Sequence, residues 1–327
     1  MKKFRLLSIF LLSICFVLTG CSRNMDPFSK SGIYFDTIIT ISLYGNEDSA
    51  LLDKCFEIAG KYENLFSKTI ETSDVYKINH SNGTPTAVDS ETIYLLEKAL
   101  EYAALTDGAI DPTILPLSDL WNFGENDTVP DSGDIALALS NVGYENVVID
   151  KASNTVTLKN PDAGIDLGFI AKGYIADKMK EYLLSQNVES ALINLGGNIL
   201  CVGSKPDGSD FTLGIQKPFE DNPTNMPLVT LKDKSLVSSG VYERCFFENN
   251  VLYHHILDTK TGYPVDNGLW GVTILSDSSM EGDAYSTICM CLGPDDGMEL
   301  IEATEGVEAL FITDAMELIY SSGFPRD

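Results

Sequence analysis

Short apolar runs separated by turn-forming residues fill the stretch from Ala191 to Leu257. Most of these runs carry β-branched or aromatic residues, and glycine, proline and asparagine stand between them. Runs of this length cross a sheet once and return through a tight turn, which is typical of antiparallel strands. We therefore expect mixed or antiparallel sheets, and not a doubly wound parallel sheet.

Helical spacing of apolar residues is confined to a few segments. The expected helices span 48–66, 89–105, about 169–184, 279–291 and about 296–304. Further strands are expected at 36–43, 308–313 and 318–320, and a hairpin joins 147–150 to 155–158. The chain shows neither an internal repeat nor a low-complexity linker. Because strands outnumber helices, the pattern predicts an α+β fold in one compact domain with two lobes.

The N-terminus has the layout of an export signal. Lys2, Lys3 and Arg5 precede an apolar run over 6–18, which is too short to span a bilayer well. The run ends in Leu-Thr-Gly followed by Cys21, which looks like a bacterial lipobox with a lipid-bearing cysteine. The alternative is an ordinary cleaved signal followed by a chance cysteine.

The lipobox reading divides the chain into three parts. We expect residues 1–20 to be a lipoprotein signal peptide, 21–30 a tether, and 31–327 the folded domain. Acyl chains on Cys21 would hold the protein at the extracytoplasmic face of the bacterial cell membrane. This is the periplasmic side if the cell has an outer membrane.

The chain is strongly acidic, with a formal net charge of −26 at pH 7. This charge argues against binding to nucleic acid and against electrostatic adhesion to anionic lipid. Any ligand that carries phosphate will therefore need a cation at its site. Beyond Cys21 the mature chain keeps five cysteines, an odd number with no C-x-x-C pair, so a disulfide framework is not expected.

The usual nucleotide loops, G-x-x-x-x-G-K-[ST] and G-x-G-x-x-G after a strand, and the hydrolase elbow G-x-S-x-G are missing. Two other clusters could bind an anion. From Asp166 to Gly173 a strand end turns into a helix, whose free N–H groups and Lys172 suit an anion. The same string also fits a plain junction capped by its aspartate. The double glycine between Asn194 and Asn198 allows close approach of a ligand, or simply makes a tight turn.

Two further clusters could carry catalysis or a metal. His254 and His255 point to opposite faces of a strand, so at most one would face a site, and either could be a structural histidine. Asp283 and Thr287 are four residues apart and stack on one helix face. Their oxygens are hard ligands suited to Mg²⁺, although most such pairs in helices bind no metal.

The order of these motifs is more informative than any one of them. Together with two further motifs, they resemble the ApbE family of FAD:protein FMN transferases over about residues 34–322. The matching segments are 106–112, 166–173, 194–197, 239–244, 255–264 and 283–287. The resemblance implies a single compact ApbE-like, T-fold-like domain. It also implies an enzyme that cleaves FAD and attaches the FMN half to a Thr or Ser of an exported or membrane-bound acceptor flavoprotein, with AMP as the other product.

Site roles follow from the resemblance by motif position. Asp283 and Thr287 look like side-chain ligands of Mg²⁺, and the backbone carbonyl of Phe169 or Gly168 completes the protein's contribution. His255 matches the histidine at the reacting centre, as a general base or as a stabiliser of the phosphates. The residues that match FAD contacts are Phe35, Ala109, Ile110, Asp111, Asp166, Lys172 and Ile256. Asn198 departs from the pattern, because an acidic residue often follows the double glycine.

Three functions remain open on the sequence alone. The first is Mg²⁺-dependent transfer of FMN to protein. The second is a Mg²⁺-dependent FAD pyrophosphatase that uses the same residues with water as the nucleophile and gives FMN and AMP. The third is a non-catalytic flavin-binding lipoprotein that delivers flavin to a partner.

Overall fold

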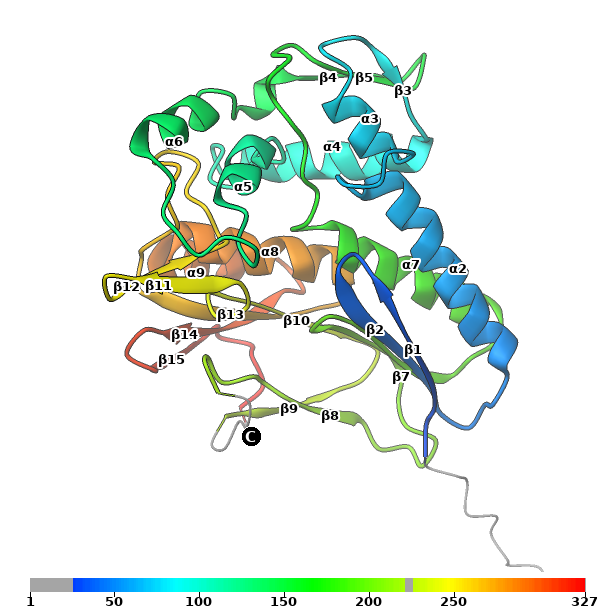
Figure 1. The fold of residues 1–327 in the computed structure, drawn as a ribbon. Helices are drawn as coiled ribbons and strands as arrows, with labels where there is room; N and C mark the ends of the chain where they lie inside the picture. Colours follow the sequence, from blue (N-terminus) through cyan, green and yellow to red (C-terminus); the bar gives the residue numbers. More distant parts are fainter. Residues whose placement is uncertain (1–25, 221–225, 327) are drawn as a thin grey trace, which may run out of the picture.

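An eight-stranded antiparallel sheet forms the base of the molecule in the computed structural model, which describes residues 26–220 and 226–326 (Figure 1). The strand order is β1-β2-β6-β7-β10-β13-β14-β15. The strands are β1 (Phe28–Tyr34), β2 (Thr37–Leu43), β6 (Ser190–Leu195), β7 (Asn198–Gly203), β10 (Ser235–Gly240), β13 (Leu269–Ser276), β14 (Glu308–Thr313) and β15 (Leu318–Tyr320). All neighbouring pairs are antiparallel, as the hairpin pattern predicts.

A layer of helices covers one face of this sheet (Figure 1). It consists of α2 (Ser49–Phe66), α7 (Ala171–Ser185), α8 (Ser279–Leu292) and α9 (Pro294–Glu302). Their apolar stripes and the inner face of the sheet form the main core, which includes Ile41, Ile175 and Ile288 at 0% exposure. This packing fixes α7 and α8 side by side, and both helices begin next to the candidate site.

The other face of the sheet is covered by a small hairpin, β8 (Phe211–Gly214) with β9 (Leu228–Leu231). A second apolar cluster lies between them and includes Phe211, Leu236 and Leu310. The sheet is therefore buried on both faces, which explains why β13 and β14, which have a strand on either side, are nearly continuous apolar runs.

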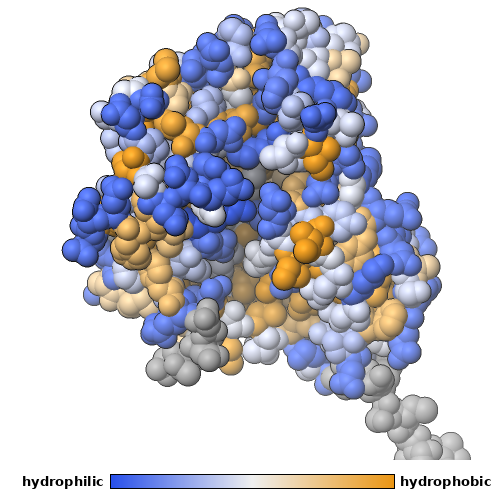
Figure 2. Space-filling model, in the orientation of Figure 1, coloured by the Kyte–Doolittle hydropathy of each residue, from blue (hydrophilic) through white to orange (hydrophobic). Residues whose placement is uncertain are grey.

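A second lobe lies above the helix layer (Figure 1). It contains α3 (Asp74–Asn79), α4 (Ser90–Leu105), α5 (Leu115–Trp121), α6 (Ser132–Leu139), the 3₁₀ turn Tyr144–Asn146, and the small sheet β3 (Thr86–Ala87), β5 (Thr155–Leu158) and β4 (Val147–Asp150). The hairpin β11 (Cys245–Glu248) with β12 (Val251–His254) packs against α5 and α6 through Trp121 and Phe246. Figure 2 shows a mainly hydrophilic face, hollowed near its centre where the two lobes meet.

The sequence expectations hold for the class and for most elements. The α+β architecture and the two lobes are confirmed, and Asp48 and Asp89 cap α2 and α4 with their side chains. Strands β1 and β13 and helices α3, α5 and α6 were not predicted. Strand β1 begins at Phe28, so the expected tether over 21–30 is wrong at its end, because these residues pair with β2.

The expected signal peptide and Cys21 lie outside the described residues. Within the described part of the chain, no helix is long and apolar enough to cross a membrane.

Candidate active site

Helices α7 and α8 approach each other very closely where the expected site residues gather. A Cβ atom on Gly173 would lie 2.1 Å from the carbonyl oxygen of Ser279, so only glycine fits between the two backbones. At this contact the amide of Gly173 donates a 2.9 Å hydrogen bond to Oδ2 of Asp283. Asp283 is 3% exposed. Its carboxylate is therefore held in one orientation at the start of α7.

Lys172 lies between two oxygen atoms of the expected metal site. Its ammonium donates a 3.1 Å hydrogen bond to the carbonyl oxygen of Gly168 and lies 3.5 Å from Oδ1 of Asp283. The carbonyl and carboxylate oxygens that the Lys172 ammonium contacts are hard ligands of the kind that Mg²⁺ prefers. The donor set therefore fits magnesium. Of the two carbonyls expected as metal ligands, that of Gly168 contacts the Lys172 ammonium, while the side chain of Phe169 is partly buried against the core.

Thr287 lies one turn further along α8 on the same face as Asp283. Its Oγ1 is 3.4 Å from Oγ of Ser239 on β10, and Ser239 is also 2.7 Å from Oγ of Ser286. Across residues 26–220 and 226–326, no three His, Cys, Asp or Glu side chains converge as metal ligands. A cation at Asp283 would therefore depend on hydroxyl and carbonyl oxygens and on the oxygens of its substrate.

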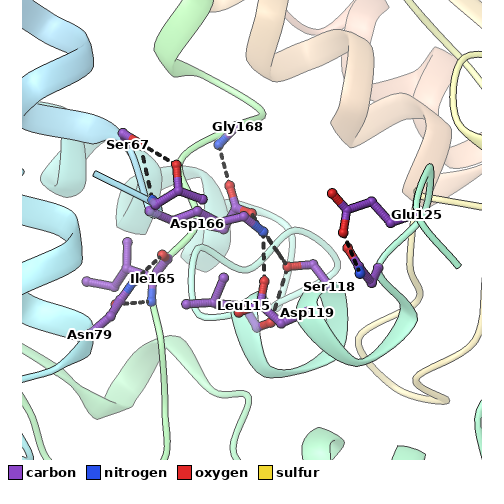
Figure 3. Close-up of polar contacts among 12 residues, drawn as sticks. Ser67, Asn79, Leu115, Ser118, Asp119, Glu125, Ile165, Asp166 and Gly168 are labelled. Carbon is purple, nitrogen blue, oxygen red and sulfur yellow. Dashed lines mark hydrogen bonds and ion pairs between the residues drawn. The ribbon is translucent and has the colours of Figure 1, made fainter. Parts of the chain in front are cut away.

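Asp166 lies in the segment before α7 and is paired with a second cation. Its Oδ1 accepts a 2.8 Å hydrogen bond from the amide of Gly168, and its Oδ2 lies 3.1 Å from Nζ of Lys68 and 3.5 Å from Oγ of Ser118 (Figure 3). Burial by itself raises the pKa of Asp166. The positive charges of Lys68 and Arg244 and the Gly168 amide outweigh burial and hold the pKa below its usual value. This carboxylate is ionised at neutral pH.

Asn79 at the end of α3 fixes the backbone that carries Asp166. Its amide group donates to the carbonyl of Ile165 at 2.9 Å, and its side-chain oxygen accepts from the amide of Ile165 at 2.6 Å (Figure 3). The amide of Asp166 then donates to the carbonyl of Pro112 at 2.8 Å. These three bonds join the segment before α7 to the upper lobe.

The two histidines have different environments, as their alternation on the strand predicts. His254 is 4% exposed, its Nε2 lies 3.0 Å from the carbonyl of Val265, and its Nδ1 accepts from the amide of Ile256 at 3.4 Å. Both nitrogens are thus used by the backbone, and His254 is a structural residue. In contrast, Nδ1 of His255 is buried and has no hydrogen-bond partner in the described chain.

His255 is held neutral by its surroundings. Burial lowers its pKa most, and His254, Arg244 and Lys172 lower it further, to about 3. A neutral imidazole with a free nitrogen can accept a proton. The same cations that lower the pKa would be offset by an anionic ligand, which would make the imidazole a stronger base.

The loop after α4 lies against the turn that follows His255. The hydroxyl of Thr259 donates a 2.6 Å hydrogen bond to the carbonyl of Gly108, next to Ala109. Ile110 is 8% exposed, and its amide lies 3.3 Å from the hydroxyl of Thr106. The structure therefore brings two segments of the expected site together, although they are 151 residues apart in the chain.

Asp111 uses its carboxylate to shape this loop. Oδ1 accepts 2.7 Å hydrogen bonds from both the amide and the hydroxyl of Thr113, and Oδ2 accepts a 2.8 Å bond from the amide of Tyr144. Burial raises the pKa of Asp111, and these bonds oppose the rise. We expected a contact with FAD at this position. The structure shows a carboxylate that is already bonded to protein groups and that positions its neighbours.

Comparison with known proteins identifies this arrangement. The model of the ApbE family matches residues 35–311. The chain belongs to the ApbE family. It is 37% identical over 297 residues to an FAD:protein FMN transferase of Klebsiella pneumoniae, covering 90% of this chain and 92% of that protein. It is 32% identical over 323 residues to an FAD:protein FMN transferase of Treponema pallidum, covering 93% and 89% of the two chains.

Solved ApbE structures have the same fold. The ApbE protein of Thermotoga maritima matches with a TM-score of 0.85 and 31% identity, over 92% of this chain and 100% of that one. The flavin transferase ApbE of Vibrio cholerae matches with a TM-score of 0.82 and 29% identity, over 91% and 98% of the two chains. The single α+β domain expected from the sequence is therefore an ApbE domain.

Two further expected FAD contacts of this ApbE chain, Phe35 and Ile256, are apolar. Phe35 is half-buried in the turn between β1 and β2, where its amide donates a 2.7 Å hydrogen bond to Glu63. Ile256 is 4% exposed and packs in the main core, so it offers a ligand little beyond its backbone.

Sequence reasoning assigned no contact to several residues that lie at this candidate site. Lys68 and Asn79 stand in no motif, and only the fold brings them to Asp166. Arg244 is different, because it ends the segment 239–244 that carries part of the resemblance, yet no role was assigned to it. Asn198 is 1% exposed and its Oδ1 accepts from the hydroxyl of Ser279 at 2.5 Å, so it connects β7 to the start of α8.

Proposed function

We propose that this ApbE protein transfers the FMN half of FAD to a Thr or Ser hydroxyl of an acceptor flavoprotein and releases AMP, with Mg²⁺ bound at Asp283. One observation carries the proposal. The buried, unpartnered Nδ1 of His255 lies in the field of two cations, Lys172 and Arg244, in a protein whose net charge is −26. Positive charge beside a free base, in a protein that is otherwise acidic, can bind a phosphoanhydride and accept the proton of an attacking hydroxyl.

The transfer step exchanges one P–O bond for another. The acceptor's hydroxyl oxygen attacks the phosphorus of the FMN half, the anhydride bond to AMP breaks, and AMP leaves with the bonding electron pair. The proton of the hydroxyl passes to His255. General-base catalysis of this kind typically raises the reaction rate by about 10² to 10⁴-fold.

The remaining residues bind and orient the pyrophosphate. Lys172 and the N-terminus of α7 place fixed positive charge where negative charge builds up in the transition state. Asp283 and Thr287, with the carbonyl of Gly168, would hold Mg²⁺, which supplies Lewis-acid stabilisation of the phosphoryl oxygens when bound. Asp283 keeps its orientation through the Gly173 amide.

We further propose that the mature chain is anchored by lipid on Cys21 at the extracytoplasmic face of the membrane. The support is the layout of residues 1–21. Anchoring would raise the concentration of the enzyme near exported or membrane-bound acceptors, and FAD would have to reach the site from outside the cytoplasm.

Incubation of the purified protein with FAD, Mg²⁺ and a candidate acceptor flavoprotein tests the reaction. Flavin fluorescence that stays on the denatured acceptor, together with release of AMP, supports the proposal. Free FMN and AMP without labelled acceptor would instead indicate a pyrophosphatase. Intact FAD would indicate a non-catalytic flavin-binding protein.

Two further measurements on this reaction test the roles of Mg²⁺ and of His255. Removal of Mg²⁺ by EDTA should stop the reaction, and added Mg²⁺ should restore it. His255→Gln should slow transfer far more than it weakens FAD binding, and an equal loss of both would reassign this histidine to binding.

Labelling of cells with palmitate, with and without Cys21→Ala, tests the anchor.

A further inference from the structure

The three cations near the site differ in how they are neutralised. Nζ of Lys68 lies 3.1 Å from Asp166, and Nζ of Lys172 lies 3.5 Å from Asp283. Arg244 makes no ion pair within 4.0 Å of any carboxylate in the part of the chain that the structure describes. Its side chain is exposed.

The position of Arg244 is set by the β11–β12 hairpin. Cys245 pairs with His254, and the next step of the ladder sets Arg244 opposite His255. The amide of His255 confirms this register, because it donates a 3.1 Å hydrogen bond to the carbonyl of Arg244. Residues directly opposite each other in an antiparallel pair project to the same face.

The field of the guanidinium reaches two residues of the site. Arg244 lowers the pKa of His255 and also contributes to the lowered pKa of Asp166. Its charge is therefore close to the free imidazole and to the segment before α7. The phosphate side of the site thus combines two lysines already paired with carboxylates and one arginine that is free to bind an anion.

Among the described residues, the guanidinium of Arg244 has no carboxylate partner although the protein has 48 acidic and 22 basic residues. A guanidinium presents a planar fork of N–H donors that matches two oxygens of a phosphate group, which a lysine ammonium cannot do. The chemistry of this position therefore suits the pyrophosphate of a dinucleotide better than a single carboxylate.

We infer that Arg244 binds the pyrophosphate of FAD beside His255 and holds the FMN phosphorus within reach of this base. The inference rests on the proposed function, which supplies FAD as the ligand. It assigns Arg244 as a binding residue that touches the substrate. Lys172 in α7 and Arg244 at the β11–β12 hairpin then contact the pyrophosphate from two different elements.

Titration of flavin fluorescence with FAD and with riboflavin, in the presence of EDTA, tests this assignment without turnover. Riboflavin has the same ring but no phosphate. Arg244→Gln should weaken FAD binding by about 10- to 100-fold, the size of a lost hydrogen-bonded charge pair. Riboflavin binding should change less than about 2-fold, within the range of neutral surface changes. Arg244→Lys should restore only part of the loss, because it keeps the charge but not the fork.

Arg326→Gln is the matched control. This substitution removes the same charge at a different place, where the guanidinium of Arg326 lies 4.7 Å from the ring centroid of Tyr320. An unchanged FAD affinity in Arg244→Gln, an equal loss for FAD and riboflavin, or wild-type protein that binds riboflavin as tightly as FAD would each overturn the assignment. Arg244→Gln could lose its preference for FAD over riboflavin while the wild-type protein transfers no flavin to an acceptor. That result would contradict the proposed function and still support Arg244 as a pyrophosphate-binding residue.

Discussion

The amide of Gly173 donates a 2.9 Å hydrogen bond to the carboxylate of Asp283, which lies 110 residues further along the chain. This bond connects α7 to α8 at the point where the two backbones nearly touch. It explains why the expected anion-binding segment and the expected metal-binding segment form one site. Four predictions follow the consequences of this contact and of the charges around it.

Gly173→Ala should force the two helices apart. The new Cβ would meet the backbone of Ser279, which cannot rotate away, so we expect a loss of about 1–3 kcal/mol in the free energy of unfolding. The Mg²⁺ concentration for half-maximal transfer should also rise. Urea unfolding and a Mg²⁺ titration of activity measure both. Gly60→Ala in α2 is the control, because its Cβ would lie 3.5 Å from Tyr34 and should leave stability unchanged or raise it by up to about 1 kcal/mol.

Asp283→Asn should lower transfer by about 10²-fold or more while the fold persists. Asparagine can still accept the hydrogen bond from Gly173, but it loses the charge that attracts a cation. Asp283→Ala would be a less specific change. Asp283 is 3% exposed, so its loss would leave the buried amide of Gly173 without a hydrogen-bond partner. Circular dichroism and steady-state kinetics separate the two effects. Full activity in Asp283→Asn would contradict the metal assignment, and exposed Asp162→Asn serves as the control.

Asp177→Asn should loosen the start of α8. The Asp177 carboxylate accepts from the amides of Ser279 at 2.8 Å and Met280 at 3.0 Å and from the hydroxyl of Ser278 at 2.8 Å. Loss of its charge should cost about 1–3 kcal/mol of stability and raise the Mg²⁺ requirement, because α8 carries Asp283. Thermal unfolding with a Mg²⁺ titration tests this. A stability loss without any change in Mg²⁺ requirement would show that Asp177 only stabilises the fold.

The control for Asp177 lies one turn further along α7. Glu181 lies 3.2 Å from Lys178, and its side chain is 65% exposed. Glu181→Gln should change neither stability nor Mg²⁺ requirement measurably, because exposed ion pairs contribute little.

Acidification should reveal the buried neutral state of His255. Burial and nearby cations lower its pKa to about 3, whereas the unfolded chain takes up a proton near the ordinary value of 6.5. Between these two values the unfolded state binds one more proton, so this residue lowers stability as the pH falls from about 6.5 towards 3. His255→Gln should remove this contribution.

Urea unfolding at pH 7 and pH 5 measures the effect. The variant should lose less stability than the wild type between these values, by an amount on the order of 1 kcal/mol. Identical pH dependence in wild type and His255→Gln would show that the imidazole is not held neutral by its surroundings.

Local sequence patterns determined the elements that stabilise themselves. The periodicity and caps of α2 and α4 are local, and so are the hairpins β6–β7 and β14–β15, since each depends on residues close in the chain. Strand β1 was not predicted because Lys30 and Gly32 interrupt its apolar alternation and none of its residues is fully buried. Strand β13 was missed although it is apolar, because its place in the sheet comes from the distant strands β10 and β14.

The sequence by itself also placed this chain in a family, through motifs that keep their order between residues 106 and 287. It could not decide how those residues act, because side-chain roles depend on distant partners. Asp111 and His254 are bonded by backbone groups, whereas His255 is left with a free nitrogen. Lys68 reaches Asp166 only in the folded chain, whereas the β11–β12 hairpin sets Arg244 opposite His255. Charge and hydrogen bonding act over a few ångströms in space, and only the tertiary structure decides which residues are that close.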